Sequence, residues 1–296
     1  MMIRIIVLQC LLSIVFVVEG INKRFAVSNV SNDQNFELIL VDRLTDLNFY
    51  VGSIHHNWVF EEEQGPVNVF IDALKNKRKK CYALDVGMND GFYTMLFAAH
   101  GCHVLSFELQ AKCIEFARVA LRENKFDHLV TVLNQPVYNE NGYLLNIGMP
   151  THGKCLGGFD ISGNLNRRMN AKSTPREYAT VALDTIVPPN GFIDALKIDV
   201  EGHDTEVLMG ARRLFRDHQI GVAVIEINSS LGLWTTEKNT SISVLKDIMS
   251  YNYTVRPATC AKGSPNLFRE LHTFEDLYHQ LFTSGDCIDF EFRLRL

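Results

Sequence analysis

Five short apolar segments, separated by helical patterns, constrain the fold of this chain most strongly. They are "CYALDV", "HVLSFE", "LVTVLN", "FIDALKIDV" and "IGVAVIEIN", which begin at residues 81, 103, 129, 192 and 220. Segments with so little polar content are typical of parallel strands that are covered on both faces. An amphipathic segment such as Ala111–Asn124 lies between two of them, with its apolar residues on one helical face. This alternation predicts a doubly wound, Rossmann-like α/β sheet, in which ligands bind at the carboxyl ends of the strands.

The last ten residues have a different hydrophobic pattern from the core strands. In "CIDFEFRLRL", apolar side chains recur at every second position from residue 288 to residue 296, and charged side chains stand between them. Strict alternation is typical of an antiparallel strand. The sheet is therefore expected to be mostly parallel with an antiparallel last strand. We also predict helices over residues 94–100, 205–217 and 241–252, and a strand or short helix over residues 36–44.

A glycine-bearing loop follows the first core strand in "LDVGMNDGFYT". A dinucleotide-binding loop needs glycines at relative positions 0, 2 and 5, but counting from Gly87 these positions hold Asn89 and Phe92. Phenylalanine at the third position prevents the close helix–strand packing that glycine permits, so NAD and FAD are disfavoured. No Gly-Lys-Ser/Thr run follows either, which excludes a P-loop. What remains is an Asp-x-Gly-x-Asn-x-Gly pattern that starts at Asp85.

This pattern favours S-adenosylmethionine, a cofactor with an amino-acid moiety and no pyrophosphate. Asp85 can accept from a cationic or N–H-bearing group, and the glycines let the backbone approach a ligand. Glu108 ends the second strand, where a carboxylate suits a contact to ribose hydroxyls. The alternative is a helix N-cap by Asp or Asn, with glycines that only make the turn.

A second constellation, "LKIDVEGHDTEVL", follows the fourth core strand. Asp199, Glu201 and His203 lie within five residues at the carboxyl end of that strand, and they are candidates for general-base chemistry. In the structural alternative, His203 or Asp204 only caps the next helix, and Glu201 pairs with Lys197 or an arginine.

Further polar residues are expected at the same edge of the sheet. Asp199, Glu226 and Asn228 can supply oxygen ligands to Mg²⁺, but strand-end acids have many other uses, so we predict no metal site. Residues 148–178 are irregular, glycine-rich and basic. A loop of this length in a compact domain suggests a lid that faces the substrate.

Over residues 80–228 the chain resembles the FkbM-type methyltransferases of the class I S-adenosylmethionine-dependent superfamily. The resemblance is carried by "LDVGMNDGFYTMLFAAHGCHVLSFE", "VALDTIV" and "ALKIDVEGHDTEVLMGA". It implies a seven-stranded sheet with an antiparallel last strand, and methyl transfer, typically to a hydroxyl oxygen of a sugar or natural product. Two positions depart from the family pattern: Leu109 stands where proline is usual, and Asp90 where an apolar residue is usual.

The resemblance also implies roles for individual residues. The cofactor loop is formed by Asp85, Gly87, Asn89, Gly91, Tyr93 and Thr94. Glu108 binds the ribose, and Asn134 and Gln135 lie near the adenine. Asp199, Glu201 and His203 line the reaction centre.

The N-terminus predicts entry into the secretory pathway. A basic start, an apolar run from Ile5 to Val18 and small residues up to Gly20 fit a signal peptide over residues 1–20, with an uncleaved type II anchor as the alternative. Residues 21–79 are taken as an N-terminal extension and residues 80–296 as the methyltransferase domain. Sequons at positions 29, 228, 239 and 252 agree with glycosylation.

Cysteine usage points the same way. Six cysteines remain after the loss of Cys10 with the signal peptide, an even number that permits disulfides. Cys260 and Cys287 form the favoured pair, because both flank segments outside the core strands. Cys81 and Cys102 begin buried strands and are interpreted as core thiols. No cysteine spacing resembles a zinc site.

The charge of the chain limits the classes of partner that it can bind. The net charge of −5 disfavours a general nucleic-acid binder. The basic run "KNKRKK" over residues 75–80 is interpreted as a solvated loop, with a docking patch for an anionic glycan or a membrane as the alternative. The leading hypothesis is an O-methyltransferase that acts on a glycan or small metabolite, with no nucleic-acid partner. The alternatives are a secreted binding protein that kept the fold without catalysis, and an N-methyltransferase.

Overall fold

The computed structural model describes residues 5–10, 13–18, 24–28, 37–41, 48–53, 64–75, 77–150, 155, 173–227, 238–262, 264–281 and 287–295. The described strands are β1 (Ile5–Cys10), β2 (Ser13–Val18), β3 (Arg24–Ser28), β4 (Glu37–Val41), β5 (Phe49–Ser53), β6 (Tyr82–Val86), β7 (His103–Phe107), β8 (Val130–Leu133), β9 (Leu144–Pro150), β10 (Ser173–Ala179), β11 (Ile193–Ile198), β12 (Ile220–Glu226), β13 (Tyr253–Cys260) and β14 (Cys287–Leu294). The described helices are α2 (Gln64–Lys75), α3 (Phe92–Ala99), α4 (Ala111–Asn124), α5 (Leu183–Ile186), α6 (Asp204–Met209), α7 (Arg212–Arg216), α8 (Lys238–Ser250) and α9 (Phe274–His279).

A seven-stranded sheet forms the centre of the molecule, in the order β13-β14-β12-β11-β6-β7-β8. β12, β11, β6, β7 and β8 run parallel to one another, and β14 is antiparallel to both of its neighbours. The predicted mostly parallel, Rossmann-like α/β sheet with an antiparallel last strand is therefore confirmed. Because β14 runs the opposite way, its first residues lie at the edge of the sheet where the parallel strands end.

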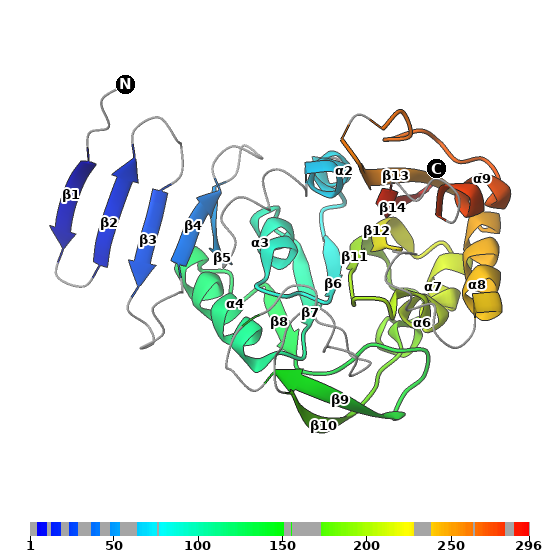
Figure 1. Ribbon diagram of the computed structural model, residues 1–296, viewed down its shortest axis with the longest axis horizontal. Coiled ribbons are helices and arrows are strands. Elements are labelled where there is room, and N and C mark those ends of the chain that lie inside the picture. Colours follow the sequence, from blue (N-terminus) through cyan, green and yellow to red (C-terminus); the bar gives the residue numbers. More distant parts are fainter. Residues whose placement is uncertain are drawn as a thin grey trace.

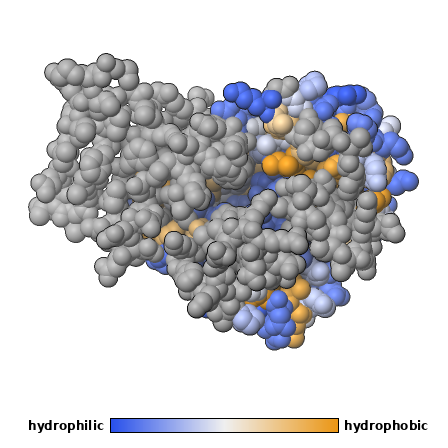
Figure 2. Space-filling model, in the orientation of Figure 1, coloured by the Kyte–Doolittle hydropathy of each residue, from blue (hydrophilic) through white to orange (hydrophobic). Residues whose placement is uncertain are grey.

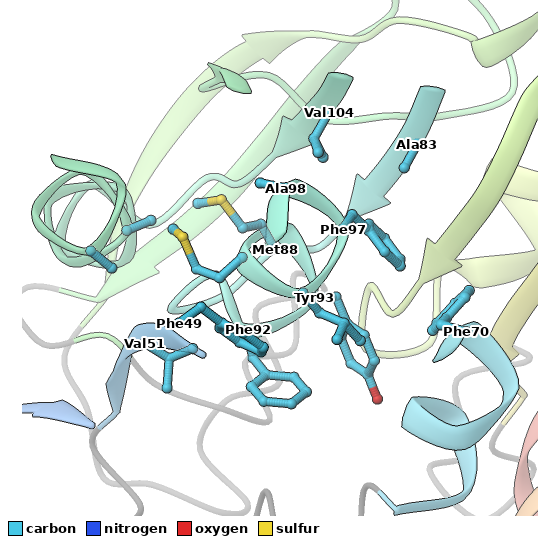
Figure 3. Packing of buried hydrophobic residues seen from close by; sticks show 14 of the residues in the cluster. Phe49, Val51, Phe70, Ala83, Met88, Phe92, Tyr93, Phe97, Ala98 and Val104 are labelled. Carbon is cyan, nitrogen blue, oxygen red and sulfur yellow. The ribbon is translucent and has the colours of Figure 1, made fainter. Parts of the chain in front are cut away.

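Helices cover both faces of this sheet (Figure 1). On one face, α2, α3 and α4 enclose a cluster in which Phe70 of α2 packs against Tyr93 and Phe97 of α3, with ring centroids 5.6 and 4.8 Å apart (Figure 3). On the other face, α6, α7 and α8 pack against Phe290 and Phe292 of β14 and their neighbours. Both clusters are built from nearly inaccessible side chains, which explains the low polar content of the core strands.

The segment 205–217, predicted as one helix, is divided into α6 and α7. The division falls at Gly210, where a Cβ atom would lie 2.1 Å from the carbonyl oxygen of Tyr138. The Gly210 carbonyl accepts from the backbone N–H of Asp184, and the Asp184 carboxylate in turn accepts from the N–H groups of Arg213 and Leu214 in α7. These contacts with another segment favour two short helices over one.

Strand β13 of the central sheet and helix α2, which packs on that sheet, were not predicted from the sequence. β13 is an edge strand that contains Pro257, a residue that cannot donate to a neighbouring strand and is tolerated at an edge. α2 falls in the segment taken as an N-terminal extension, yet it packs on β11, β12 and β13. The division of the chain at residues 20 and 79 stays a prediction.

A two-stranded antiparallel ribbon of β9 and β10 occupies both ends of the segment that was expected to be irregular. The rest of that segment, apart from Cys155, lies outside the described residues. Tyr143 and Leu144, at the start of the ribbon, are about half exposed. Figure 2 shows hydrophobic surface at the bottom of the molecule and again in its upper right part.

The N-terminal part contains a five-stranded antiparallel sheet, β1 to β5. Phe49 of β5 packs against Phe92 of α3, and Asn124 of α4 exchanges hydrogen bonds with the backbone of Tyr50. β4 confirms the strand alternative for residues 36–44. The signal peptide stays a prediction, and among the described helices none has both the length and the apolar character needed to cross a membrane.

Three disulfides join six of the seven cysteines: Cys81–Cys102, Cys113–Cys155 and Cys260–Cys287. The predicted Cys260–Cys287 pair is confirmed. The interpretation of Cys81 and Cys102 as core thiols is wrong: β6 and β7 are neighbouring parallel strands, so the residues that precede them lie side by side. Strand propensity alone could not reveal this adjacency.

Candidate cofactor and reaction site

The loop after β6 is shaped by three residues with positive φ: Gly87 (85°), Asn89 (53°) and Gly91 (94°). A Cβ atom on Gly87 would lie 1.8 Å from the carbonyl oxygen of Asp199, so glycine is required where this loop meets the end of β11. A Cβ atom on Gly91 would lie 3.1 Å from the Cβ of Ala117 in α4. The spacing of these residues therefore serves a backbone turn that packs against two other elements.

Asp85 lies beneath this loop in a buried polar network. Thr94 donates to one Asp85 oxygen at 2.6 Å, and the Thr94 hydroxyl is 2.7 Å from the hydroxyl of Ser106. The other oxygen, Oδ1, is buried and has no hydrogen-bond partner among the described residues. Burial raises the pKa of Asp85 to about 6, although the bond from Thr94 and the charge of Lys197 oppose the rise. A buried acceptor without a donor is costly, and a cationic or N–H-bearing ligand group would satisfy it.

Glu108 holds the turn after β7. One of its carboxylate oxygens accepts from the backbone N–H groups of Leu109 and Gln110, and the other accepts from Asn89 at 2.8 Å. Burial raises the pKa of Glu108 against these bonds. A carboxylate has about four acceptor positions, so roughly one is left for a ligand, on the oxygen bound to Asn89. The side-chain amide of Asn134 donates to the carbonyls of Glu108 and Leu109 and so lies at this strand end as expected.

A disulfide borders the same loop. The side-chain oxygen of Asn89 is 2.9 Å from the sulfur of Cys155 and 3.5 Å from that of Cys113. These sulfurs are bonded to each other and have no hydrogen to donate, so the contacts are close oxygen–sulfur approaches. Cys155 is thus tied to α4 directly beside the loop. The sequence carried no signal for this pairing, because any of the six cysteines had five possible partners.

Two expected site residues turn elsewhere. The ring of Tyr93 packs in the core between Phe70, Phe92 and Phe97 (Figure 3). The amide of Gln135 donates to the carbonyl of Ala179, at the end of β10. Thr94 is completely buried and acts through its bond to Asp85. The structure therefore brings together Asp85, Gly87, Asn89, Gly91, Glu108 and Asn134. Tyr93 packs in the core below Lys197, whose ammonium is 5.6 Å from the ring centre, and Gln135 is directed toward β10.

At the end of β11, Asp199 belongs to a charged cluster. The ammonium of Lys197 lies 3.4 Å from an oxygen of Asp199 and 3.1 Å from an oxygen of Asp289 on β14. Asp199 and Glu226 are hydrogen-bonded to each other. Burial alone would raise the pKa of Asp199, but the charge of Lys197 and the bond to Glu226 lower it. Burial and the Asp199 charge raise the pKa of Glu226, whereas the pKa of Asp199 is lowered, so the two carboxyls titrate as a coupled pair.

The loop between β11 and α6 carries the other two expected catalytic residues. Glu201 is half-buried and has a left-handed backbone conformation (φ 54°), which is uncommon outside glycine. The Asp204 carboxylate accepts from the N–H groups of Val200 and Gly202 and so fixes the loop. Next to it, the His203 ring lies 6.4 Å from that of Tyr138, and its Nε2 is buried without a hydrogen-bond partner among the described residues.

The residues at the carboxyl ends of β6, β7, β11 and β12 form a strongly acidic cluster. Burial raises the pKa of Asp90 and of Asp204 to about 7 each, and the charges of neighbouring carboxylates add to both rises. The ionised carboxylates therefore repel one another, and a positively charged ligand would offset this repulsion. Asp90, where an apolar residue was expected, joins this group through its proximity to Asp85 and Glu108.

Two residues of this cluster were missed at the sequence level. Lys197 was considered only as a partner of Glu201, although a lysine inside an apolar strand was itself a signal that carboxylates lie nearby. The alternating pattern of the last ten residues predicts that Asp289 lies on a polar strand face, but it is only 4% exposed, because that face is covered. No group of three or more His, Cys, Asp or Glu residues that could hold a metal ion occurs in the described part of the chain. Asn228 lies outside it.

Comparison with known proteins gave one family match. A family model described as "Methyltransferase FkbM domain" matches residues 85–251. No curated protein sequence matches the chain.

Solved structures of low identity were also found. A methyltransferase FkbM from Methylobacillus flagellatus KT is 14% identical with a TM-score of 0.41, over 74% of this chain and 45% of that one. This chain thus spans less than half the length of that protein. A precorrin-6y C5,15-methyltransferase from Geobacter metallireducens GS-15 is 10% identical with a TM-score of 0.39, over 81% of this chain and 93% of that one. An rRNA methylase from Streptococcus thermophilus is 12% identical with a TM-score of 0.41, over 78% and 97%. At these values the structures carry no argument about function.

Proposed function

Because the chain belongs to the FkbM methyltransferase family, we propose that it transfers a methyl group from S-adenosylmethionine to a hydroxyl oxygen of a glycan or small metabolite in the secretory pathway. The observation that carries this proposal is the cluster of carboxylates at the carboxyl edge of the sheet. There the loop at residues 86–91, Glu108 and Asp199 meet within the matched segment. Parallel α/β sheets bind their ligands at this edge.

The residues present fit S-adenosylmethionine. The buried Oδ1 of Asp85 has no described donor, and the carboxylates around Asp85 favour a cationic ligand. Glu108 keeps about one acceptor position for a ribose hydroxyl, and Asn134 borders the same strand end. When bound, the cofactor supplies an activated methyl group on a positively charged sulfur. The chain itself contributes the negative charge that complements this sulfur, and a loop that has Phe92 where a dinucleotide-binding loop needs its third glycine.

The acceptor hydroxyl must also lose a proton during transfer. Asp199, Glu201 and His203 all lie on or beside the loop that follows β11, within the matched segment. The charge of Lys197 lowers the pKa of Asp199, whereas burial and the Asp199 charge raise the pKa of its neighbour Glu226. We assign Asp199, Glu201 and His203 to the reaction centre, where an ionised carboxylate or a neutral imidazole can accept that proton.

The secretory setting rests on other features. Three disulfides are compatible with an oxidising compartment, and four sequons and the apolar N-terminal run agree with it. The reaction there requires S-adenosylmethionine to be supplied to the lumen. We therefore expect the functional form to be a disulfide-bonded protein of the secretory pathway or of its membranes.

The test is a transfer experiment. The oxidised full chain is incubated with S-adenosylmethionine that carries a labelled methyl group, together with a library of glycans and small hydroxylated metabolites. We expect label on a hydroxyl oxygen of one acceptor class. Label on nitrogen would make the chain an N-methyltransferase. Binding of the cofactor without transfer to any acceptor would favour the non-catalytic binding protein.

A further inference from the structure

The start of β14 places a carboxylate in the candidate reaction centre. Asp289 is paired in register with Glu226 of β12, and it lies outside the segment that the family model matches. Since β14 is antiparallel to β12, its first residues reach the edge of the sheet where β11 and β12 end. The C-terminal strand therefore contributes to a site that its family motif alone would place between residues 85 and 251.

Lys197 connects Asp289 to Asp199. Its ammonium lies 3.1 Å from Asp289 and 3.4 Å from Asp199, and 5.6 Å from the centre of the Tyr93 ring. The side chains of Lys197 and Asp289 are 2% and 6% exposed, whereas that of Asp199 is 27% exposed. Asp289 is thus the buried partner at the closer distance, and Asp199 is the partner that reaches solvent. A buried ammonium needs such partners, because an uncompensated charge in the interior is costly.

We propose that Asp289 is a positioning residue for methyl transfer: it draws the Lys197 ammonium toward the buried side, so that Asp199 is held in place and keeps its exposed side available, beside Glu201 and His203, to accept a proton at the reaction centre. This inference rests on the proposed function. Without Asp289, the flexible lysine stem would let the ammonium pair fully with Asp199. Asp199 would then be a weaker proton acceptor, turned toward the core.

Several other charged groups surround Asp199, and they set the direction of the expected effects. Asp85 on β6, Glu108 after β7, Asp204 on α6, Glu226 on β12 and Asp289 on β14 are all acidic. In the described part of the chain, Lys197 is the cation that is ion-paired with Asp199 and Asp289. Removing one negative charge from this group lowers the pKa of the carboxyls that remain, and removing the lysine raises it.

Glu291 offers a matched control. It lies on the same strand, two residues beyond Asp289, and is similarly buried. Its ion-pair partner is Arg293, not Lys197. Asp289→Asn and Glu291→Gln therefore each remove one buried carboxylate charge from β14, but only the first acts on Lys197.

The experiment measures kcat, KM for S-adenosylmethionine and the pH profile of methyl transfer, with the acceptor found by label transfer. For Asp289→Asn we expect kcat to fall about 10-fold or more with KM within a few-fold of wild type, and the acidic limb of the profile to move to lower pH by about 0.5 or more. Lys197→Met should move the same limb to higher pH. Asp289→Glu should restore part of kcat, and Glu291→Gln should keep the wild-type profile.

The results for these variants decide whether Asp289 has a positioning role. Thermal unfolding of every variant sets the assay temperature well below its midpoint, so that loss of folded protein does not imitate loss of rate. If Asp289→Asn keeps the wild-type kcat and pH profile, or if Glu291→Gln changes them equally, Asp289 has no positioning role. If Lys197→Met does not fold, Asp289→Asn and Asp289→Glu still decide. Absence of transfer by the wild-type protein would instead contradict the proposed function.

Discussion

Gly87 lies in the expected cofactor loop and is also required by the fold. Both its positive φ (85°) and the 1.8 Å approach of a would-be Cβ to the Asp199 carbonyl require glycine. At Gly101 φ is also positive (75°), but no atom lies within 4 Å of the Cβ position. The two glycines therefore separate the cost of backbone strain from the cost of a steric clash.

We predict that Gly87→Ala destabilises the protein more than Gly101→Ala does. The second variant should cost about 1–2 kcal/mol, the usual penalty for a left-handed residue with a side chain. The first adds displacement of the β11 end, and we expect it to abolish binding of S-adenosylmethionine. Denaturant unfolding and calorimetric titration measure the two effects. Equal losses of stability, with binding kept in Gly87→Ala, would show that the loop does not depend on this contact.

Glu201 is a second residue whose role can be isolated. Gln has nearly the same shape and can keep the left-handed backbone (φ 54°) that Glu201 adopts. If Glu201 accepts the proton of the acceptor hydroxyl, Glu201→Gln should lower kcat by roughly 100-fold or more and leave the affinity for S-adenosylmethionine within a few-fold. Steady-state kinetics and cofactor titration check this. Wild-type turnover would remove Glu201 from the mechanism.

At the scale of elements, the Cys113–Cys155 disulfide ties a segment of the expected lid to α4, beside the loop at residues 86–91. The Cys260–Cys287 disulfide instead joins β13 to β14. Both close loops of comparable length, 42 and 27 residues. They should therefore stabilise the fold to a similar extent but differ in their effect on the acidic cluster.

We predict that replacing Cys113 and Cys155 together by Ser lowers the free energy of unfolding by about 2–4 kcal/mol, as does the same change at Cys260 and Cys287. Only the first pair of changes should also weaken binding of S-adenosylmethionine, because Asn89 contacts those sulfurs. Denaturant unfolding and calorimetric titration of both double variants supply the comparison. Equal weakening of binding in both would mean that the disulfide acts through global stability alone.

The sequence predicted some elements well and others poorly, for identifiable reasons. The core strands and α4 carry their own burial pattern, so their places follow from periodicity. β13, the division at Gly210 and the Cys81–Cys102 pair depend on contacts between distant segments. The same holds in the site: the glycine loop and strand-end acids could be found locally, whereas Asp289 required knowledge that β14 lies beside β12.

At the scale of the whole molecule, the acidic cluster links stability to pH. Asp85, Asp90 and Asp204 have pKa values of about 6, 7 and 7 in the folded state, above the ordinary value of 3.8. Between roughly pH 4 and pH 7 the folded state therefore binds more protons than the unfolded state. Asp199, whose pKa is lowered, affects stability only below this window.

We predict that the free energy of unfolding without cofactor falls as pH rises through this window, by up to about 1.4 kcal/mol per pH unit for each excess proton. S-adenosylmethionine should reduce this loss, since a cationic ligand favours the ionised carboxylates. Denaturant unfolding at several pH values measures how the free energy of unfolding changes with pH, once without and once with the cofactor. A stability that rises with pH over this range would contradict the assigned environments.

Calorimetric titration of the oxidised full chain with S-adenosylmethionine shows whether the acidic cluster at the strand ends binds the cofactor. We expect saturable binding of one cofactor per chain, tighter at pH 8 than at pH 5, with stabilisation of about 2.7 kcal/mol when the cofactor exceeds its Kd 100-fold. Absence of heat, together with an unchanged unfolding midpoint at millimolar cofactor, would show that the acidic cluster does not bind S-adenosylmethionine and that the proposed cofactor site is wrong.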